Sequence, residues 1–457
     1  MKIIFLSIDK IDGKNVERIY GCSYSVYPTE NLAISYASSI LKKAGYQVMF
    51  FAIDDIERTM IPDAEIYLIH SVYQTIETDL KLIKRIKNRR VFVFGPAPTM
   101  NPENYLASKN IFVLRGEIED ILLSAIFNPA KTKSVSFLKS GKVINNSSAG
   151  PILNLDKILF PDRELSKQDY FNPKLAYKKN AHVMTSRGCA HSCYFCVPNS
   201  ISWARELEWK RGKRGKPPVI VRSVKNIVSE ISELYANGFR EFSFVDDQFI
   251  VGERRILQLL AEIKKLKINF GILARCDKLL NLKLVKSLAQ AGCRYVDLGV
   301  ESFDQKILND IGKQLKKSDI YKSIKLLNRC KIEPKLNIMF GTSKLEDKKF
   351  INETITETLK LPLNYCMFSI ATPFAGTEFA KFAEKNKLIV SDIRDPLKGS
   401  VSYPHLSARE LQKLNRYAYF KFYFRPRIIF SQIKKVKNFS IFHQLSSSIL
   451  NFIKNIR

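Results

Sequence analysis

The sequence predicts an α/β protein made of a doubly wound parallel sheet, a partial β/α barrel and a basic, helical C-terminal region. Apolar runs of strand length alternate with amphipathic helices in the first 135 residues. The same alternation resumes near residue 181, with more residues between successive strands. No strand pattern follows residue 396. Strands that alternate with helices form parallel sheets, so two such sheets are expected.

Five runs rich in β-branched and aromatic residues predict the strands of the first sheet. They lie at residues 2–8, 46–53, 64–71, 90–95 and 111–116. Amphipathic stretches at 31–45 and 76–88 predict helices between them, and Gly45 is a typical helix stop. We therefore expect a Rossmann-like domain over residues 1–135.

Open parallel sheets bind ligands beyond the carboxyl ends of their strands. In the first predicted sheet those ends carry His70 and Ser71, then the run GPAPT at 95–99, then GEIED at 116–120. These positions are the candidate ligand-binding edge of this domain.

Residues 136–180 hold several prolines and no regular pattern, which predicts a linker. A second series of strands and helices follows over residues 181–395. Its predicted strands lie at 181–188, 240–246, 269–275, 294–301, 335–341 and 365–371. Its predicted helices lie at 224–238, 253–266, 282–292, 317–330 and 348–361. Six β/α units make most of a TIM-like barrel, whose sites lie at the carboxyl ends of the strands.

The C-terminal region, residues 396–457, is basic and predicted to be mostly helical. From Ser407 to Arg457 it contains eleven Lys or Arg and one acid, Glu410. The whole chain has a net charge of +30, which favours anionic partners or, alternatively, reflects a Lys-rich solvated surface. Residues 431–457 resemble a basic amphipathic helix, which either lies on an anionic membrane surface or packs on the barrel.

The composition indicates a globular protein of the cytoplasm. No apolar run approaches the ~18 residues that a spanning helix needs. The start, MKIIFLSIDK, lacks a signal-peptide pattern and is expected to be a buried strand. Eight cysteines in 457 residues are too few for a secreted disulfide scaffold.

Three of the eight cysteines are clustered in RGCAHSCYFC, residues 187–196, directly after the first barrel strand. Zinc usually takes four ligands in two separated pairs, and no second pair exists here, although His191 could be a fourth ligand. Cys189, Cys193 and Cys196 suit a [4Fe–4S] cluster with one iron left open to bind a chelating ligand.

The spacing C-x₃-C-x₂-C after the first strand of a β/α barrel resembles that of the radical SAM superfamily. Phe195, the aromatic residue before the last cysteine, also matches that pattern. The resemblance implies that the three cysteines hold a [4Fe–4S] cluster and that its open iron chelates S-adenosylmethionine (SAM). No further catalytic residue is assigned.

Other stretches resemble the branch of that superfamily with an N-terminal cobalamin-binding-type domain. FSFVDDQF places Asp246 and Asp247 where the family contacts the methionyl amino group of SAM, although a helix-cap region is an alternative. LARCD places Arg275 where a guanidinium can pair with the SAM carboxylate. LGVES places Glu301 and Ser302 near the expected ribose, and a structural Arg275–Glu301 salt bridge is the alternative.

In the N-terminal domain, the runs at 27–48, 94–99 and 115–120 resemble the cobalamin-binding partner domain. The resemblance assigns cobalamin contacts to His70, Ser71, Gly95, Ala97, Thr99 and Gly116. The cobalt-ligating motif D-x-H-x-x-G has no match, since Ile11 stands in the place of the histidine. Cobalamin binding is therefore left open, and a structural role for His70 is the alternative.

The resemblance implies reductive cleavage of SAM with an electron from a flavodoxin- or ferredoxin-type donor, followed by hydrogen abstraction from an unactivated carbon. Cobalamin-dependent C-methylation or oxidative cyclisation of a small or lipid-like substrate is expected, at or near the inner face of the membrane. The alternatives are a tRNA-modifying, methylthiotransferase-like enzyme and a non-catalytic, zinc-stabilised nucleic-acid-binding protein.

Overall fold

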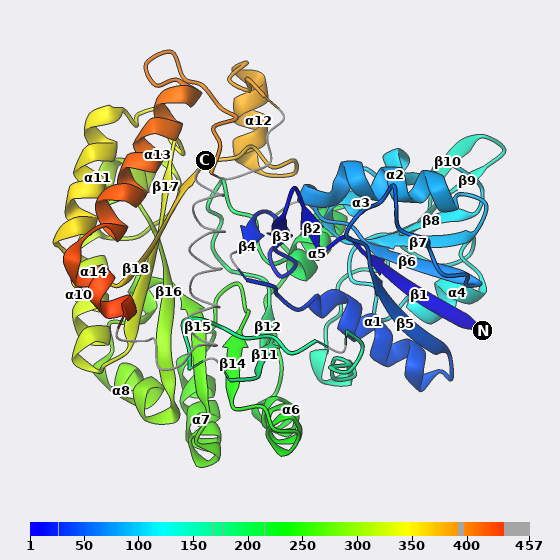
Figure 1. Ribbon diagram of the computed structural model, residues 1–457, viewed down its shortest axis with the longest axis horizontal. Coiled ribbons are helices and arrows are strands. Elements are labelled where there is room, and N and C mark those ends of the chain that lie inside the picture. Colours follow the sequence, from blue (N-terminus) through cyan, green and yellow to red (C-terminus); the bar gives the residue numbers. More distant parts are fainter. Residues whose placement is uncertain (26, 167, 177, 214, 392–396, 434–457) are drawn as a thin grey trace. The chain divides into compact units, whose positions relative to one another are not determined.

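A computed structural model describes the chain except for the following residues, about which no structural statement is made: 26, 167, 177, 214, 392–396 and 434–457. The chain divides into two compact units. The first comprises Met1–Tyr170, Ser186–Ala190 and Pro198–Arg222, and the second comprises Phe171–Thr185, His191–Val197 and Ser223 onward. Figure 1 shows a helix-flanked sheet in each unit.

The first unit contains a seven-stranded sheet in the order β10-β9-β8-β7-β6-β1-β5. Its strands are β1 (Lys2–Ser7), β5 (Gln47–Ala52), β6 (Ile66–His70), β7 (Arg90–Phe94), β8 (Ile111–Leu114), β9 (Val135–Lys139) and β10 (Lys142–Asn145). The five strands from β5 to β8 in this order are parallel, whereas β9 pairs antiparallel with β8 and β10 antiparallel with β9.

Helices cover both faces of this sheet. They are α1 (Leu32–Lys43) and α4 (Leu122–Phe127) on one face and α2 (Ile76–Ile86) and the short α3 (Pro96–Met100) on the other, while α5 (Ser200–Lys210) packs against α3. Alternate residues of β1 face opposite sides of the sheet, so Phe5 packs with Ile34 of α1 in one core and Leu6 packs with Leu82 of α2 in another. Two buried cores around one parallel sheet confirm the doubly wound domain.

The structure differs from the predicted linker at residues 136–180. Most of β9 and all of β10 fall inside this range and extend the first sheet. Short strands also form two small sheets in the first unit. These are β2 (Lys10–Ile11), β3 (Lys14–Val16) and β4 (Tyr24–Ser25), and the pair β12 (Ser186–Arg187) and β13 (Ile220–Val221). Strands this short carry no periodicity that sequence analysis detects.

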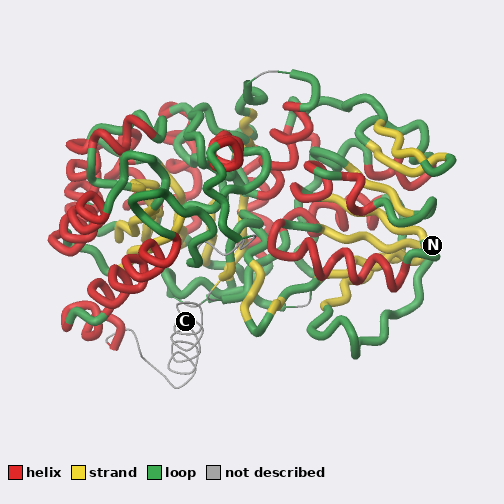
Figure 2. The backbone as a smooth tube through the Cα atoms, turned by 90° about the horizontal axis from the view of Figure 1, so that it is seen from above, coloured by secondary structure: helices red, strands yellow, loops and turns green. Residues whose placement is uncertain are grey.

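The second unit contains six parallel strands that follow their sequence order across the sheet. They are β11 (Asn180–Val183), β14 (Glu241–Phe244), β15 (Asn269–Ala274), β16 (Cys293–Glu301), β17 (Glu333–Phe340) and β18 (Tyr365–Ile370). β11 and β18 are the two ends of this order. The curved sheet confirms the predicted partial barrel, and Figure 2 shows its strands in yellow beside the helices in red.

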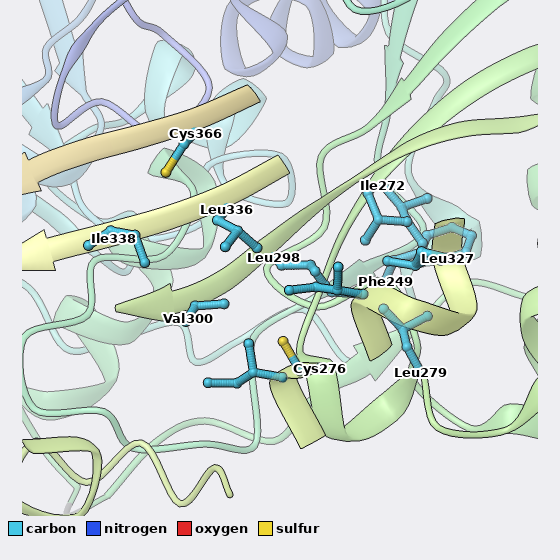
Figure 3. Close-up of a cluster of buried hydrophobic side chains, with 14 of the residues drawn as sticks. Phe249, Ile272, Cys276, Leu279, Leu298, Val300, Leu327, Leu336, Ile338 and Cys366 are labelled. Atoms are coloured by element: carbon cyan, nitrogen blue, oxygen red, sulfur yellow. The ribbon is translucent and has the colours of Figure 1, made fainter. Parts of the chain in front are cut away.

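Helices pack against the outer face of this barrel. They are α6 (Val224–Ala236), α7 (Glu253–Ile263), α8 (Leu282–Ala291), α9 (Gln305–Asp310), α10 (Lys317–Arg329), α11 (Lys348–Lys360) and α12 (Glu378–Lys385). Figure 3 shows the core between sheet and helices, where Leu298 of β16 and Leu336 of β17 lie in the same cluster as Leu327 of α10. Apolar residues at every second strand position explain why this face is buried.

The described part of the C-terminal region contains two helices, as the sequence predicts. It forms α13 (Ala408–Tyr423), which opens with a capping box between Ser407 and Glu410, and α14 (Pro426–Ile433). Most of the predicted amphipathic tail at 431–457 lies outside the described residues. In the described part of the chain, no helix combines the length and the apolar character needed to cross a membrane.

We expect Gly292→Ala to destabilise the second unit strongly. Gly292 ends α8 with φ +103°, and an added Cβ would lie 1.9 Å from the carbonyl oxygen of Ile268. Left-handed backbone and overpacking together cost about 2–5 kcal/mol. Gly238→Ala, at φ +87° with no atom within 4 Å of the added Cβ, is the matched control and should cost about 1–2 kcal/mol. Denaturation followed by circular dichroism compares them, and equal losses would contradict the packing argument.

Candidate functional site

The cysteine loop, residues 188–197, follows β11 and β12 at the carboxyl end of the barrel sheet. Cys189 and Cys193 are half-buried and Cys196 is exposed. The amide of Cys196 donates to the carbonyl of Cys193 at 3.1 Å, which forms a tight turn between these two cysteines. Three thiol side chains on one short loop are the donor set that an iron–sulfur cluster requires.

No group of three or more His, Cys, Asp or Glu side chains lies close enough to hold a single metal ion within the described residues. Thiolates that bind an iron–sulfur cluster ligate different irons, so they do not need to converge on one point. The chemistry and exposure of the loop cysteines therefore fit a cluster. His191 is half-buried, and burial and then Arg275 lower its pKa.

Asp246 anchors the strand end that leads into the cysteine loop. Its Oδ1 accepts hydrogen bonds from the amide of Thr185 at 3.0 Å and from the Thr185 hydroxyl at 2.9 Å. Arg255 donates to the carbonyl of Thr185 at 2.8 Å. α7 begins after Gly252, its N-cap, so the alternative of a helix-capping role for Asp246 is wrong. Asp247, next in the chain, is half-buried at the same strand end.

Phe195 is buried in the barrel core rather than at the surface of the loop. The neighbouring Tyr194 packs edge-on against Phe379 at the start of α12, with ring centroids 5.5 Å apart. The Phe379 amide also donates to the Tyr194 carbonyl at 3.0 Å. The end of the cysteine loop is thus fixed to the barrel by aromatic packing and a backbone hydrogen bond.

Arg275 follows β15 with one nitrogen left for a ligand. Its Nε donates to Asp277 at 2.9 Å and its Nη2 to the carbonyl of Gln314 at 3.1 Å. Its Nη1 is buried and has no hydrogen-bond partner among the described residues. A buried guanidinium nitrogen without a partner is costly unless an anion binds it. This observation fits the predicted contact with the SAM carboxylate.

Glu301 ends β16 in a backbone conformation that non-glycine residues rarely adopt, with φ +68°. Its Oε1 lies 2.8 Å from Nζ of Lys313, and both side chains are almost fully buried. The alternative of an Arg275–Glu301 salt bridge is wrong, because each of these residues pairs elsewhere. A held carboxylate at this strand end is suited to contact a ribose or an amino group.

Lys313 is a residue of this site that the sequence did not indicate. Burial alone would lower its pKa, but the attraction of the Glu301 carboxylate opposes burial and the pKa is raised. The adjacent Gly312 lies against the loop, since a Cβ there would be 3.6 Å from the carbonyl oxygen of Ser192. Lys313 stands 12 residues beyond Glu301 in a turn, so no local pattern connects the two.

The Ser302 side chain makes its hydrogen bonds to neighbouring protein groups. Its hydroxyl lies 3.3 Å from the Thr354 hydroxyl and accepts from the Asp304 amide at 3.1 Å. These contacts shape the turn between β16 and α9. The SAM role assigned to Ser302 stays a prediction.

In the first unit, His70 ends β6 in a tightly packed place. Burial and then Arg18 hold its pKa well below the usual range, so the ring is neutral, and its Nδ1 has no partner among the described residues. A Cβ on Gly95 would lie 2.8 Å from Cδ2 of His70 and 2.5 Å from the Ser71 carbonyl oxygen. The Ser71 hydroxyl lies 2.9 Å from the Tyr105 hydroxyl.

The other three residues assigned to cobalamin are also buried. Thr99 donates to the Gly95 carbonyl at 2.7 Å and accepts from the Gly116 amide at 3.1 Å, and Ala97 lies between them in α3. Glu208 of α5 covers Gly116, where an added Cβ would lie 3.0 Å from Cβ of Glu208. These residues therefore pack mainly on one another, and Gly116 also lies against α5. Among the described residues, the buried Nδ1 of His70 is the observation that favours a ligand. No chemical step is assigned to cobalamin.

A buried ion-pair group binds both flanks of the cysteine loop to the first unit. Arg187, two residues before Cys189, pairs with Glu117 at 2.7 Å and with Glu119 at 2.5 Å. Arg205 of α5 pairs with Glu117 at 3.1 Å. Burial raises the pKa of Glu117, and the nearby positive charge of Arg187 opposes this shift without cancelling it. The run GEIED, expected to contact a ligand, instead supplies these carboxylates.

Three comparisons extend these observations. The model of the radical SAM superfamily matches residues 183–352. Over 383 residues the chain is 29% identical to an uncharacterised methyltransferase of Pyrococcus horikoshii, and the match covers 80% of this chain and 79% of that protein.

Two solved structures share the fold. The first is the radical S-adenosylmethionine methyltransferase TsrM from Kitasatospora setae with cobalamin and a [4Fe–4S] cluster bound, with a TM-score of 0.62, 15% identity, and coverage of 90% of this chain and 81% of that chain. The second is the cobalamin-dependent S-adenosylmethionine radical enzyme OxsB in its apo form, with a TM-score of 0.66, 14% identity, and coverage of 98% and 72%.

We expect Glu117→Gln to destabilise the first unit, because it leaves Arg187 and Arg205 buried with less negative charge. Breaking a buried ion pair costs about 3–5 kcal/mol. Both tryptophans of the chain, Trp203 and Trp209, lie in α5, so tryptophan fluorescence during urea denaturation follows this unit.

Asp63→Asn is the control for this prediction. It removes an exposed pair with Arg89, at 2.7 Å, and should cost less than about 1 kcal/mol. A loss for Glu117→Gln as small as that of the control would contradict the structural role of the buried group.

Proposed function

The chain belongs to the radical SAM superfamily, and from this premise we propose that Cys189, Cys193 and Cys196 hold its [4Fe–4S] cluster. When bound, such a cluster delivers an electron that cleaves SAM and produces a radical able to abstract hydrogen from carbon. The observation that carries the proposal is the three-cysteine loop at the carboxyl end of β11, beside polar groups on neighbouring strand ends. We further propose a flavodoxin- or ferredoxin-type electron donor.

Residues of the barrel position SAM in this proposal. Arg275 pairs with its carboxylate through Nη1, which lacks a partner among the described residues. Glu301, held by Lys313 at 2.8 Å, contacts the ribose or the amino group. Asp246 acts through Thr185, because its carboxylate binds the strand end before the loop rather than solvent. Phe195 packs behind the loop and helps to exclude water.

C-methylation is the reaction that we propose for this enzyme. The support is the similarity over four fifths of the chain to a protein described as a methyltransferase. The structural likeness to a methyltransferase with cobalamin bound supports a cobalamin-binding-type first unit. Methylcobalamin, where a protein binds it, supplies a methyl group to substrate. Oxidative cyclisation is the reaction that remains if the first unit binds no cobalamin.

We expect anaerobic reconstitution with iron and sulfide to give a brown protein that cleaves SAM when reduced. Cys193→Ala should abolish both the broad visible absorption and the formation of 5′-deoxyadenosine, because one iron loses its ligand. Cys330→Ala is the matched control, since Cys330 is also half-buried but lies at the end of α10. A Cys193→Ala protein that cleaves SAM at the parent rate would refute the cluster assignment.

A second proposal concerns location. We propose a cytoplasmic enzyme that contacts the inner face of the membrane through its C-terminal region, and a lipid-like substrate. Phe420 of α13, Phe424 between the two helices and Phe430 of α14 are 56%, 65% and 64% exposed. Lys421 and Arg427 are exposed among them. Aromatic and cationic side chains together are typical of surfaces that lie at an anionic bilayer.

We expect the full-length protein to co-sediment with vesicles that contain anionic lipid, and a protein of residues 1–430 to bind them less. Phe424→Ser should also weaken this binding. Phe127→Ser is the control, because Phe127 is 78% exposed but lies on α4 of the first unit. Equal, negligible binding by the full-length and shortened proteins would end the proposal.

A further inference from the structure

One edge of the first sheet is formed by a strand that pairs on one side. β5 (Gln47–Ala52) pairs with β1 and is the last strand in the sheet order. Figure 1 shows it beside β1 at the end of this sheet. Among the described residues, no strand pairs with its other side. Such an edge presents a row of backbone donors and acceptors to which another strand can bind.

The hydrogen bonds of β5 identify the backbone groups at this edge. The amide of Gln47 donates to the carbonyl of Met1 at 3.3 Å. The amide of Ile53 donates to the carbonyl of Ser7 at 2.8 Å. Alternate residues of a strand bond to the same neighbour, so the odd-numbered residues of β5 bond to β1. The amides and carbonyls of the three even-numbered residues therefore point to the open edge, and these residues are Val48, Phe50 and Ala52.

The two edges of the sheet differ in how they are protected against further pairing. β10 (Lys142–Asn145), at the opposite edge, has four residues and begins with a lysine. Short strands and charged residues are common means of preventing contact between sheet edges. β5 has six residues, QVMFFA, without a charge or a proline, and all of them pair in register with β1. The β5 edge thus lacks these protections.

The β5 edge is complementary to a second copy of itself in an antiparallel arrangement. Val48 and Ala52 lie symmetrically about Phe50, so a two-fold axis at Phe50 pairs Val48 with Ala52 of the partner. In an antiparallel ladder such pairs exchange both hydrogen bonds, and every edge-facing amide and carbonyl of β5 is satisfied. Met49, which is 41% exposed, then lies opposite Phe51 of the partner and gains an apolar cross-strand contact.

The charges at the two ends of β5 favour the same arrangement. Exposed Lys43, at the end of α1, precedes the strand, and exposed Asp54 follows it. Antiparallel pairing places the start of one strand beside the end of the other, so opposite charges meet at both ends. Parallel pairing would bring like charges together. Charges arranged in this way select the partner and its orientation.

We propose that β5 pairs with β5 of a second copy of this chain and joins the first sheets of two protomers into one continuous sheet. The inference goes beyond the proposed function, because it involves no residue of the cysteine loop or of the barrel. Backbone hydrogen bonds supply the binding, and the apolar side chains and terminal charges supply the selectivity for a second copy. A contact of one strand is small, so the dimer dissociates on dilution.

The test is sedimentation velocity of the full-length protein from about 1 to about 100 µM, where a small interface is expected to form and dissociate. Met49→Lys should raise the dissociation constant of the dimer about tenfold or more, because a lysine on the edge opposes pairing. Val143→Lys is the matched control, since Val143 is 37% exposed on the opposite edge strand. A monomer at every concentration would assign the edge to another partner and overturn the proposal, as would equal weakening by both substitutions.

A proline tests whether the backbone of β5 makes the contact. Ala52→Pro removes an amide that faces the open edge and should abolish the dimer, whereas Ala52→Ser keeps this amide and should dimerise like the parent. Proline is tolerated on an edge strand where its nitrogen faces outward. A dimer that survives in folded Ala52→Pro protein would show association through a different surface and contradict the proposal. A thermal unfolding curve verifies that each variant is folded, and Met49→Lys decides the test if Ala52→Pro is not.

A charge exchange tests the antiparallel orientation. Lys43→Glu should weaken the dimer severalfold, because two acidic groups then meet at each end of the paired strands. Adding Asp54→Lys to this variant restores opposite charges and should recover most of the lost affinity. Failure of the double substitution to recover affinity would refute the antiparallel arrangement.

Discussion

The buried pairing of Arg187 and Arg205 with Glu117 is the interaction on which the position of the cysteine loop depends. It fixes one residue shortly before the first cysteine and one helix shortly after the last to the end of β8. These charged side chains are almost fully buried, so they tolerate little displacement, because each lost contact leaves a buried ion without its partner. The segments before and after the loop, 186–190 and 198–222, are thereby held within the first unit, and Tyr194 and Phe195 pack within the second.

Sequence reasoning located the regular strands and the three cysteines, because strand periodicity and motif spacing are local properties. The eleven predicted strands all occur, from β1 to β18. It missed β9 and β10, whose few residues follow no clear alternation, and it missed Lys313, which meets Glu301 only through a turn. It also assigned Gly116 and its neighbours to a ligand, whereas α5, distant in sequence, packs on them. Such contacts depend on tertiary structure.

The two faces of the barrel sheet serve different purposes. Outer-face residues such as Leu298 and Leu336 join the core beneath the helices and stabilise the barrel. Inner-face residues such as Asp297 and Lys335 are less completely buried and include charged groups that pair with each other. Arg275 follows β15 and Glu301 ends β16, so strands that build the core also position the residues that we propose to contact SAM. A substitution can thus affect either property according to whether its position is odd or even along the strand.

Glu301 combines an unfavourable backbone conformation with a buried ion pair. At φ +68° a glycine would relieve about 1–2 kcal/mol of backbone strain. It would also remove the carboxylate that Lys313 holds and leave that ammonium group without its partner. Breaking this buried pair costs about 3–5 kcal/mol, which exceeds the strain that glycine would relieve, so the ion pair favours glutamate even for folding alone. The rare backbone conformation at position 301 is therefore maintained by the ion pair that its side chain makes with a residue 12 positions further along the chain.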